Sequence, residues 1–293
     1  MELKHLGDSK SSYAVETDKF DPTLLDIIER KPIREEWGIK GHEFVGYDVW
    51  HAYETTFLTE KGVPVAGTLK IVVPAFTTHI VESKSLKLYL NSFDMCKMGT
   101  TVKEATENFE QQVAWDLGKI LCCTIHVHFF TDKTVTRNVF GLYTDLYDIV
   151  DPDTFEVTDY KSETNHLKWV EQANASQNIE VYSNVLRSRC RHTKQKDTGT
   201  AFIKLRAEGG YIQMRTILQQ IISLREQNEF HEPCCEKLFC DIRKISGVKE
   251  LMVALLYARR GGIDINPVRV TSSNFLPKFF GNENILVSKT FGQ

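Results

Sequence analysis

The chain has 293 residues, of which 42% are hydrophobic and 26% are charged. This length suits one large domain or two of ordinary size, and the composition is that of a globular protein with a full core. The net charge of −3 gives no electrostatic footprint for direct nucleic-acid or anionic-membrane binding. No stretch is apolar enough for a signal peptide or a membrane span. We therefore expect a cytoplasmic protein.

The cysteines are seven in number and spread through the chain. An odd count without a tight spacing framework is typical of a reducing compartment rather than of a disulfide scaffold. Each cysteine is then expected to be a core thiol, a metal ligand or a nucleophile.

The first half begins with an arm over residues 1–36, which mixes charged residues, Ser and Asp and includes a short expected helix near residues 22–29. A folded module is expected over residues 37–150. Apolar and polar positions alternate over residues 44–58, and a Gly-Pro turn leads to a second apolar run over residues 67–74. This pattern predicts an antiparallel hairpin.

A helix is predicted over residues 102–120 of the same module. Thr101 and Glu104 match a capping box at its start. The alternating run over residues 121–130 predicts another strand. The buried face of the helix is expected to comprise Val102, Ala105, Phe109, Val113 and Leu117.

The second half is expected to repeat this arrangement. Polar residues 151–178 are expected to form a connection to a second module over residues 179–293. Strands and helices packed to one side of antiparallel sheets give an α+β fold class. The predicted elements of this module are strands at 200–207 and 250–257, helices at 211–225 and 233–245, a turn at Gly209-Gly210, and loop and tail after Gly262.

Cys190 is a candidate nucleophile. A lone cysteine is more often an inert core thiol, but basic neighbours lower a thiol pKa and favour the thiolate. Asp197 follows seven residues later and could act as a general acid, or could be an ordinary turn aspartate before Thr198-Gly199. The basic neighbours of the thiol are Arg187, Arg189, Arg191, His192 and Lys194.

His231 and Glu232 form a second candidate pair. His231 could move protons near neutral pH. Glu232 could accept two hydrogen bonds from the N–H edge of a guanine-like ring, although an acidic residue at a helix start is also unremarkable. Zinc is a weaker alternative for this stretch because no CxxC pair occurs. Its potential ligands are His231, Cys234, Cys235, Cys240 and Glu236, with His126 and His128 as a separate pair.

Neither GxGxxG nor GxxxxGK[ST] occurs in the sequence. A bound nucleotide would therefore need basic side chains for its phosphates, and Lys84, Arg259 and Arg260 are the candidates.

Three segments carry a family resemblance. They are residues 82–93 (ESKSLKLYLNSF), residues 228–232 (NEFHE) and residues 259–267 (RRGGIDINP). In this order they resemble the NADPH-dependent 7-cyano-7-deazaguanine reductases, the QueF nitrile reductases of queuosine biosynthesis, in their long, two-module form. The resemblance spans most of the chain.

The resemblance implies reduction of the nitrile to an aminomethyl group through a covalent Cys190 thioimide and two hydride transfers from NADPH, with no metal. Asp197 would protonate the nitrile nitrogen, and His231 would act beside it. The implied fold is two tandem tunnelling-fold modules, assembled as a homodimer that binds a small deazapurine and no nucleic acid directly. Implied substrate contacts are Val81, Glu82, Ser83, His231 and Glu232, and implied NADPH contacts are Ser83, Lys84, Arg260 and Gly261.

The segment around Cys190 departs from the family pattern. That pattern reads close to SNCPVTxQPDWG, whereas this chain reads SRCRHTKQKDTG over residues 188–199. Without the prolines and the tryptophan, the loop is expected to be less rigid and less apolar. Two other readings stay open: a metal-dependent purine or pterin hydrolase of the same fold superfamily, and a base-binding protein without catalytic activity.

Overall fold

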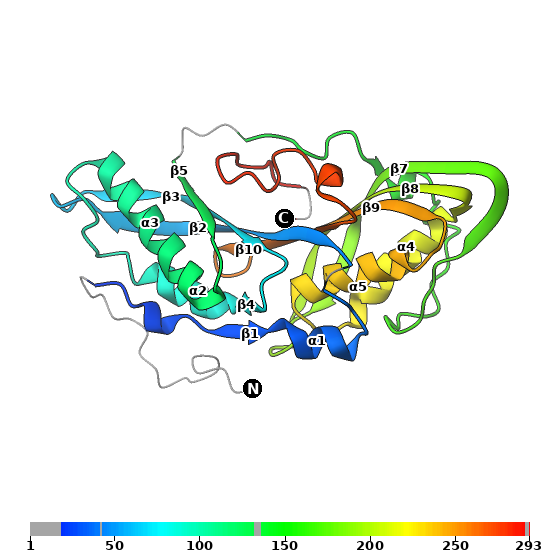
Figure 1. Cartoon of the computed structure of the whole chain (residues 1–293), viewed down its shortest axis with the longest axis horizontal. Helices are drawn as coiled ribbons and strands as arrows, with labels where there is room; N and C mark the ends of the chain where they lie inside the picture. The colour runs from blue at the N-terminus through cyan, green and yellow to red at the C-terminus, as the bar shows by residue number, and fades with distance from the viewer. Residues whose placement is uncertain (1–18, 42, 132–135, 291–292) are drawn as a thin grey trace.

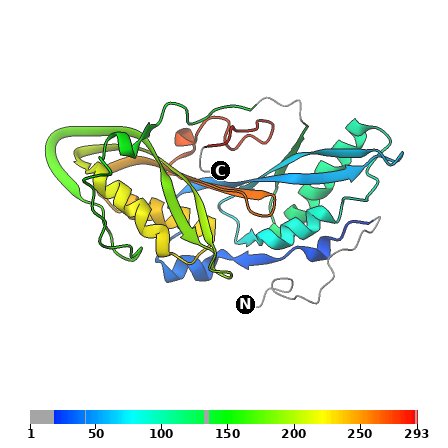
Figure 2. The same ribbon diagram turned by 180° about the vertical axis from the view of Figure 1, so that it is seen from behind.

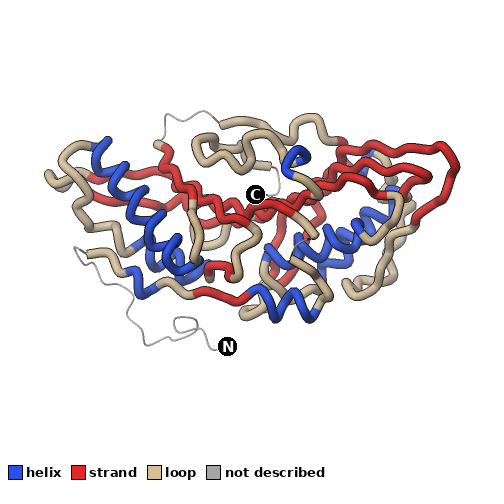
Figure 3. Tube along the Cα trace, viewed as in Figure 1, coloured by secondary structure: helices blue, strands red, loops and turns tan. Residues whose placement is uncertain are grey.

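The computed structural model describes residues 19–41, 43–131, 136–290 and 293. One eight-stranded sheet runs through the molecule in the order β5-β3-β2-β10-β9-β8-β7-β6. All neighbouring strands are antiparallel except β6 and β7. Helices α2, α3, α4 and α5 lie on one side of this sheet (Figures 1 and 3). The expected α+β class with antiparallel strands is confirmed.

The first half contains the predicted hairpin. Strands β2 (Val45–Leu58) and β3 (Pro64–Pro74) pair over most of their length, and β5 (His126–Phe130) adds to the free edge of β3. The apolar side chains that alternate along these strands pack against α2 (Ser83–Asn91) and α3 (Val102–Leu121). These elements enclose the hydrophobic core of the first half.

Helix α3 shows how local sequence sets an element. The backbone N–H of Glu104 donates to the Thr101 hydroxyl at 3.1 Å, and the Glu104 carboxylate accepts from the N–H of Thr100 at 2.9 Å. The expected apolar face is buried with one exception, because Val102 is 50% exposed. Side chains tilt toward the helix N-terminus, so this first helical residue projects past the packed face. The expectation that Val102 is buried was wrong.

The second half begins with a long hairpin of β7 (Trp169–Arg189) and β8 (Lys196–Ile212). The expected boundary between residues 178 and 179 therefore falls inside β7. The expected turn at Gly209-Gly210 was also wrong, since both glycines lie within β8, where Gly209 has φ +78° beside an irregularity in the pairing. Helices α4 (Met214–Ser223) and α5 (His231–Arg243) and strand β9 (Val248–Tyr257) follow as predicted.

Strand β10 (Ile263–Val270) was expected to be loop and is instead central to the sheet. Its eight residues all pair with β2, and three of them also pair with β9. The strand is not recognisable in the sequence because it contains polar residues. Each of these residues has a buried partner in the folded protein. Asp264, for example, accepts a hydrogen bond from the Tyr53 hydroxyl at 2.7 Å. This strand joins the two halves into one sheet.

The N-terminal arm differs from the expected helix over residues 22–29. It has one 3-10 turn, η1 (Pro22–Leu24), then β1 (Ile27–Glu29) and helix α1 (Arg30–Glu36). Strand β1 pairs with β4 (His79–Val81) in a separate two-stranded sheet on the helical side of the molecule. The arm thus runs from the first half to helix α5 of the second half, where α1 lies beside it (Figure 1).

The face of the large sheet opposite the helices is covered by irregular chain. The C-terminal segment crosses this face, as Figure 2 shows from behind. Phe140 and Phe280 pack there against Phe202 and Met252 of the sheet. None of the described helices is long and apolar enough to cross a membrane. The short elements β6 (Thr144–Asp145), η2 (Leu146–Asp148), η3 (Leu224–Glu226) and η4 (Ser273–Phe275) complete the described chain.

Candidate active site

A cavity of about 410 Å³ lies on the helical side of the sheet, between the elements of the two halves. It collects side chains from β4 and α2 of the first half and from the β7–β8 hairpin, α5 and the β9–β10 loop of the second. All ten residues singled out from the sequence line it, namely Val81, Glu82, Ser83, Lys84, Cys190, Asp197, His231, Glu232, Arg260 and Gly261.

The wall from the first half is the N-terminus of α2. Glu82 is its N-cap, and its carboxylate accepts from the backbone N–H groups of Lys84 at 3.0 Å and Ser85 at 2.6 Å. These are two of the donors that a helix start leaves without intrahelical partners. Lys84 and Lys87, on the first turns of the helix, also line the cavity. The motif therefore places a fixed carboxylate and two cations on one wall.

Cys190 lies in the loop of the β7–β8 hairpin. The backbone N–H of Cys190 donates to the carbonyl of Gln195 at 2.9 Å, and the N–H of Lys194 donates to the carbonyl of Cys190 at 3.0 Å. Arg189, just before the thiol, makes two backbone hydrogen bonds with the segment that precedes α5: its N–H donates to the carbonyl of Gln227, and its carbonyl accepts from the N–H of Glu229. The loop that carries the thiol is thus tied to the segment that delivers His231.

Polar contacts hold this loop at Arg191, where the family pattern has a proline, and at Gln195, where the family pattern also has glutamine. Arg191 pairs with Glu229 at 2.5 Å, and the carboxylate of Glu229 is almost fully buried. The side-chain carbonyl of Gln195 accepts from Arg260. Burial raises the pKa of Glu229, although the N–H of Phe230 and the charge of Arg191 oppose that rise. The loop is more polar than the family pattern, as expected, and its side chains are bound to Glu229 and Arg260 by hydrogen bonds and an ion pair.

Asp197 lies between His231 and the guanidinium of Arg260. Its side chain is 4% exposed, with one carboxylate oxygen bonded to the Arg260 guanidinium and the other 3.6 Å from Nε2 of His231. Burial raises the pKa of Asp197, but the hydrogen bonds and charges of His231 and Arg260 outweigh it, so the pKa lies below its ordinary value. Asp197 is therefore a carboxylate in this arrangement, with a proton carrier directly beside it.

His231 is oriented by an aromatic stack. Its ring lies parallel to that of Tyr257, the last residue of β9, with centroids 3.7 Å apart and 7° between planes. Tyr257 is fully buried, and the Ser188 hydroxyl donates to its oxygen at 3.4 Å. Nδ1 of His231 is buried without a hydrogen-bond partner among the described residues. The stack and the contact with Asp197 therefore set the position of the ring.

Glu232 is deeply buried, at 2% exposure. Burial raises its pKa to about 8, and the nearby charge of Asp48 adds to the rise, while Arg30 and Arg269 partly offset it. A raised pKa identifies a carboxyl group whose charged form needs a partner that the protein alone does not supply.

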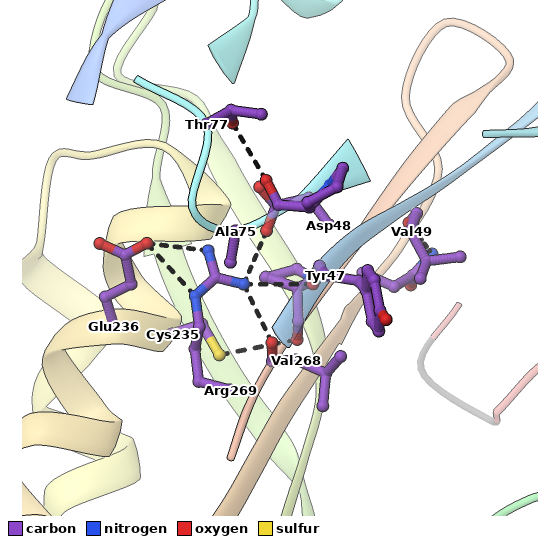
Figure 4. Close-up of polar contacts among 12 residues, drawn as sticks. Tyr47, Asp48, Val49, Ala75, Thr77, Cys235, Glu236, Val268 and Arg269 are labelled. Carbon is purple, nitrogen blue, oxygen red and sulfur yellow. Dashed lines mark hydrogen bonds and ion pairs between the residues drawn. The ribbon is translucent and has the colours of Figure 1, made fainter. Parts of the chain in front are cut away.

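A buried ion network lies beside Glu232. Arg269 is fully buried, and its guanidinium bridges Asp48 of β2 and Glu236 of α5 at 2.8 Å each (Figure 4). From α1, Arg30 pairs with Asp48 at 2.5 Å and Arg34 with Glu236 at 2.7 Å. Since Glu236 follows Glu232 by one helical turn, the network fixes the face of α5 that enters the cavity.

Sequence reasoning missed several residues of the cavity. Lys87, Gln195 and Glu229 line it, and Tyr257 supports His231 from beneath. Only Lys87 carried a signal, because it follows Lys84 at helical spacing. Arg259, expected to face a phosphate, lies instead over the Tyr53 ring at 5.2 Å and does not line the cavity.

The residues proposed as zinc ligands are dispersed by the fold. Cys234 and Cys235 are fully buried in the core under α5, where burial raises the pKa of each thiol well above its ordinary value. Cys240 is buried farther along the same helix. Across the described parts of the chain, no group of three or more His, Cys, Asp or Glu side chains could hold a metal ion.

Comparison with known proteins agrees with this geometry. A protein from Rickettsia bellii, described as NADPH-dependent 7-cyano-7-deazaguanine reductase, is 36% identical over 268 residues, which cover 91% of this chain and 92% of the relative. The chain belongs to this reductase family. Relatives of the same description from Cupriavidus pinatubonensis and Coxiella burnetii are each 35% identical, over 88% of this chain and 90% and 89% of their own lengths.

The 7-cyano-7-deazaguanine reductase family model, described as a nitrile reductase N-terminal region, matches residues 16–129. That range includes α2 and the cap at Glu82. The longer alignments extend through the second half, since 268 of 293 residues include Cys190 wherever the alignment begins. Both walls of the cavity therefore lie within the part of the chain that resembles these reductases.

Proposed function

We propose that this protein reduces the nitrile of 7-cyano-7-deazaguanine to the aminomethyl group with NADPH, as a step of queuosine biosynthesis for tRNA modification. The observation that carries the proposal is the single cavity in which a thiol, an Asp-His pair and a buried unpaired carboxyl group meet. The family membership supplies the substrate.

Cys190 is the proposed nucleophile. Its sulfur adds to the nitrile carbon, one carbon–nitrogen π bond breaks, and the nitrogen takes a proton, which gives a thioimide without any redox change. Covalent addition converts a poor hydride acceptor into a reducible carbon–nitrogen double bond. The proposed proton source is Asp197 together with His231, which lie 3.6 Å apart beside the loop that carries the thiol.

Glu232 is the proposed anchor for the deazaguanine ring. The N–H groups along one edge of such a base would donate to both carboxylate oxygens, a charge-assisted pairing that suits a buried acid. Val81, Glu82 and Ser83 lie on the opposite wall and would contact the other side of the ring. Binding would then supply the partner that the buried, charged form of Glu232 lacks in the free protein.

The cavity also fits NADPH as co-substrate. Lys84 and Arg260 lie on its wall beside Ser83, and such cations match the phosphates of a dinucleotide. A Cβ at Gly261 would come within 3.3 Å of Nζ of Lys87, so glycine keeps this wall open. When bound, NADPH supplies the two hydrides.

We further infer two tandem tunnelling-fold modules, a homodimer and a cytoplasmic location. What supports the modules is the recurrence of a strand hairpin, two helices and further strand in each half: β2, β3, α2, α3 and β5, then β7, β8, α4, α5, β9 and β10. Light scattering of the purified protein would test the dimer.

Intact-mass spectrometry after incubation with the nitrile alone tests the central step. We expect an adduct of the mass of one substrate molecule, lost in Cys190→Ala and retained in Cys122→Ala, which removes an exposed thiol at the end of α3. Nitrile binding without an adduct and without NADPH consumption would instead indicate a base-binding protein.

A further inference from the structure

The guanidinium of Arg260 is held by two side chains of the β7–β8 hairpin. One nitrogen donates to a carboxylate oxygen of Asp197 and another donates to the side-chain carbonyl of Gln195. Arg260 itself comes from the loop between β9 and β10, at the mouth of the cavity. Its side chain is 40% exposed, whereas that of Asp197 is 4% exposed. One accessible cation thus neutralises one buried carboxylate.

We propose that Arg260 is shared between two anions, Asp197 in the free protein and a phosphate of the bound cofactor, so that cofactor binding delivers a proton to Asp197. This inference rests on the proposed function and extends it. It makes Arg260 a coupling residue between the cofactor and the acid, in addition to a cofactor contact.

Arg260 is free to change partners. In the described chain its side chain contacts only Asp197 and Gln195, and neither contact comes from its own loop. Gly261 and Gly262 follow it with φ +57° and +80°, a left-handed turn that lets the loop present the side chain to the cavity. Two oxygens of a phosphate can accept from a guanidinium in the same bidentate way as the two oxygens of a carboxylate.

The charged groups around Asp197 make its state depend on Arg260. His231 faces it from α5 and Arg260 from the β9–β10 loop. The further titratable groups of the cavity are Glu82, Lys84 and Lys87 on the wall of α2, Cys190 and His192 on the hairpin loop, and Glu229 and Glu232 on the side of α5. Without Arg260, only His231 opposes the effect of burial, so the pKa of Asp197 rises toward the neutral acid. Asp197 would then hold the proton that the nitrile nitrogen takes as the Cys190–carbon bond forms.

Calorimetric titration with NADP⁺ tests the coupling without any chemistry on the nitrile. Titrations at pH 6 in two buffers of different ionisation enthalpy give the number of protons taken up. We expect net uptake in the wild-type protein, and its loss in both Asp197→Asn and Arg260→Gln. The ionisation of the NADP⁺ phosphate is common to the wild type and Asp197→Asn, which both keep Arg260, so it cancels in that comparison.

Arg259→Gln is the matched control. Arg259 directly precedes Arg260 in the chain, but its guanidinium lies over Tyr53 outside the cavity. The variant should take up protons as the wild type does. NADP⁺ binding without uptake, or with equal uptake in Asp197→Asn, would overturn the coupling and leave the reductase proposal standing. Failure of NADP⁺ to bind the wild type would overturn both.

The covalent step gives a second readout. The pH at which adduct formation falls to half should move upward when NADP⁺ is added to the wild type. In Arg260→Gln it should already be higher and should not respond to NADP⁺. Thermal unfolding shows whether Arg260→Gln has lost its fold. If it has, Arg260→Lys, which keeps the charge, is used in its place. A lysine variant with the wild-type response would support the role of charge, and an unresponsive wild type would exclude it.

Discussion

Two glutamates start helices on opposite walls of the cavity, and their surroundings differ. Glu82 caps α2 and accepts from two backbone N–H groups, whereas Glu232, the second residue of α5, has within the described chain only its own N–H as hydrogen-bond donor. Both are buried, at 6% and 2% exposure. Burial is therefore not what separates them. The amide donors make Glu82 a structural anion, and their lack leaves Glu232 with acceptor capacity for a ligand.

The largest expected effect on the free energy of unfolding comes from removing Arg269, the buried cation of the ion network beside Glu232. Arg269→Met removes the fully buried cation that bridges Asp48 and Glu236 and leaves only Arg30 and Arg34 to pair with these two acids. Breaking a buried ion pair from one side costs about 3–5 kcal/mol. Urea unfolding should show this loss. Arg206→Met, which removes a half-exposed partner of Glu250, should change stability by no more than about 1 kcal/mol. Equal losses in both variants would contradict the importance of burial.

Glu232→Gln breaks the proposed pairing with the base while keeping the shape of the side chain. Charge-assisted hydrogen bonds contribute about 1.5–3 kcal/mol, which corresponds to a roughly 10- to 150-fold fall in kcat/KM for the nitrile. The exposed Glu226→Gln serves as control. An unchanged kcat/KM in Glu232→Gln would remove Glu232 from the substrate site.

The pH dependence of the stability of Glu232→Gln tests the same contrast between Glu82 and Glu232. Because the pKa of Glu232 rises from 4.5 to about 8 in the folded protein, the native state holds a proton that the unfolded state has lost between these values. The free energy of unfolding that this proton contributes is fully present below 4.5, the pKa of the unfolded state, and is lost as the pH rises toward 8. The melting temperature of Glu232→Gln should therefore gain on the wild type from pH 5 to pH 8. A constant difference would show that Glu232 titrates normally.

The smallest effect is expected at the other helix start. Glu82→Ala removes the cap of α2, which costs about 1 kcal/mol. Glu82→Gln keeps an acceptor oxygen and should lose less. Urea unfolding of the two variants measures the cap directly. If Glu82→Ala were as stable as the wild type, the contrast between the two glutamates would fail on its structural side.

The sequence allowed prediction of those parts of the fold that local pattern controls. The alternation in β2 and the capping box of α3 each depend on neighbours along the chain. Strand β10 does not, because Asp264 and Arg269 are stable inside a sheet only through partners far away in sequence, Tyr53 and Asp48 among them. Propensity alone reads such a strand as loop.

The candidate site follows the same division. Motifs identified ten of the residues that line the cavity, since short segments carry them. The relations among those residues were not predictable: the contact of Arg260 with Asp197 spans 63 positions, and the stack of His231 on Tyr257 joins a helix to a strand. Such contacts depend on how the halves meet in space. They also decide which acid carries charge.

Strand β10 has a consequence for how ligands reach the site. Its pairing with β2 runs through all eight residues, so both walls of the cavity are built on one continuous frame. Hinge closure, the usual route by which two-lobed enzymes admit and enclose their substrates, would require breaking that ladder. Ligands therefore enter and leave between halves that stay joined, past the hairpin loop at Cys190 and the glycine turn after Arg260, which line the cavity.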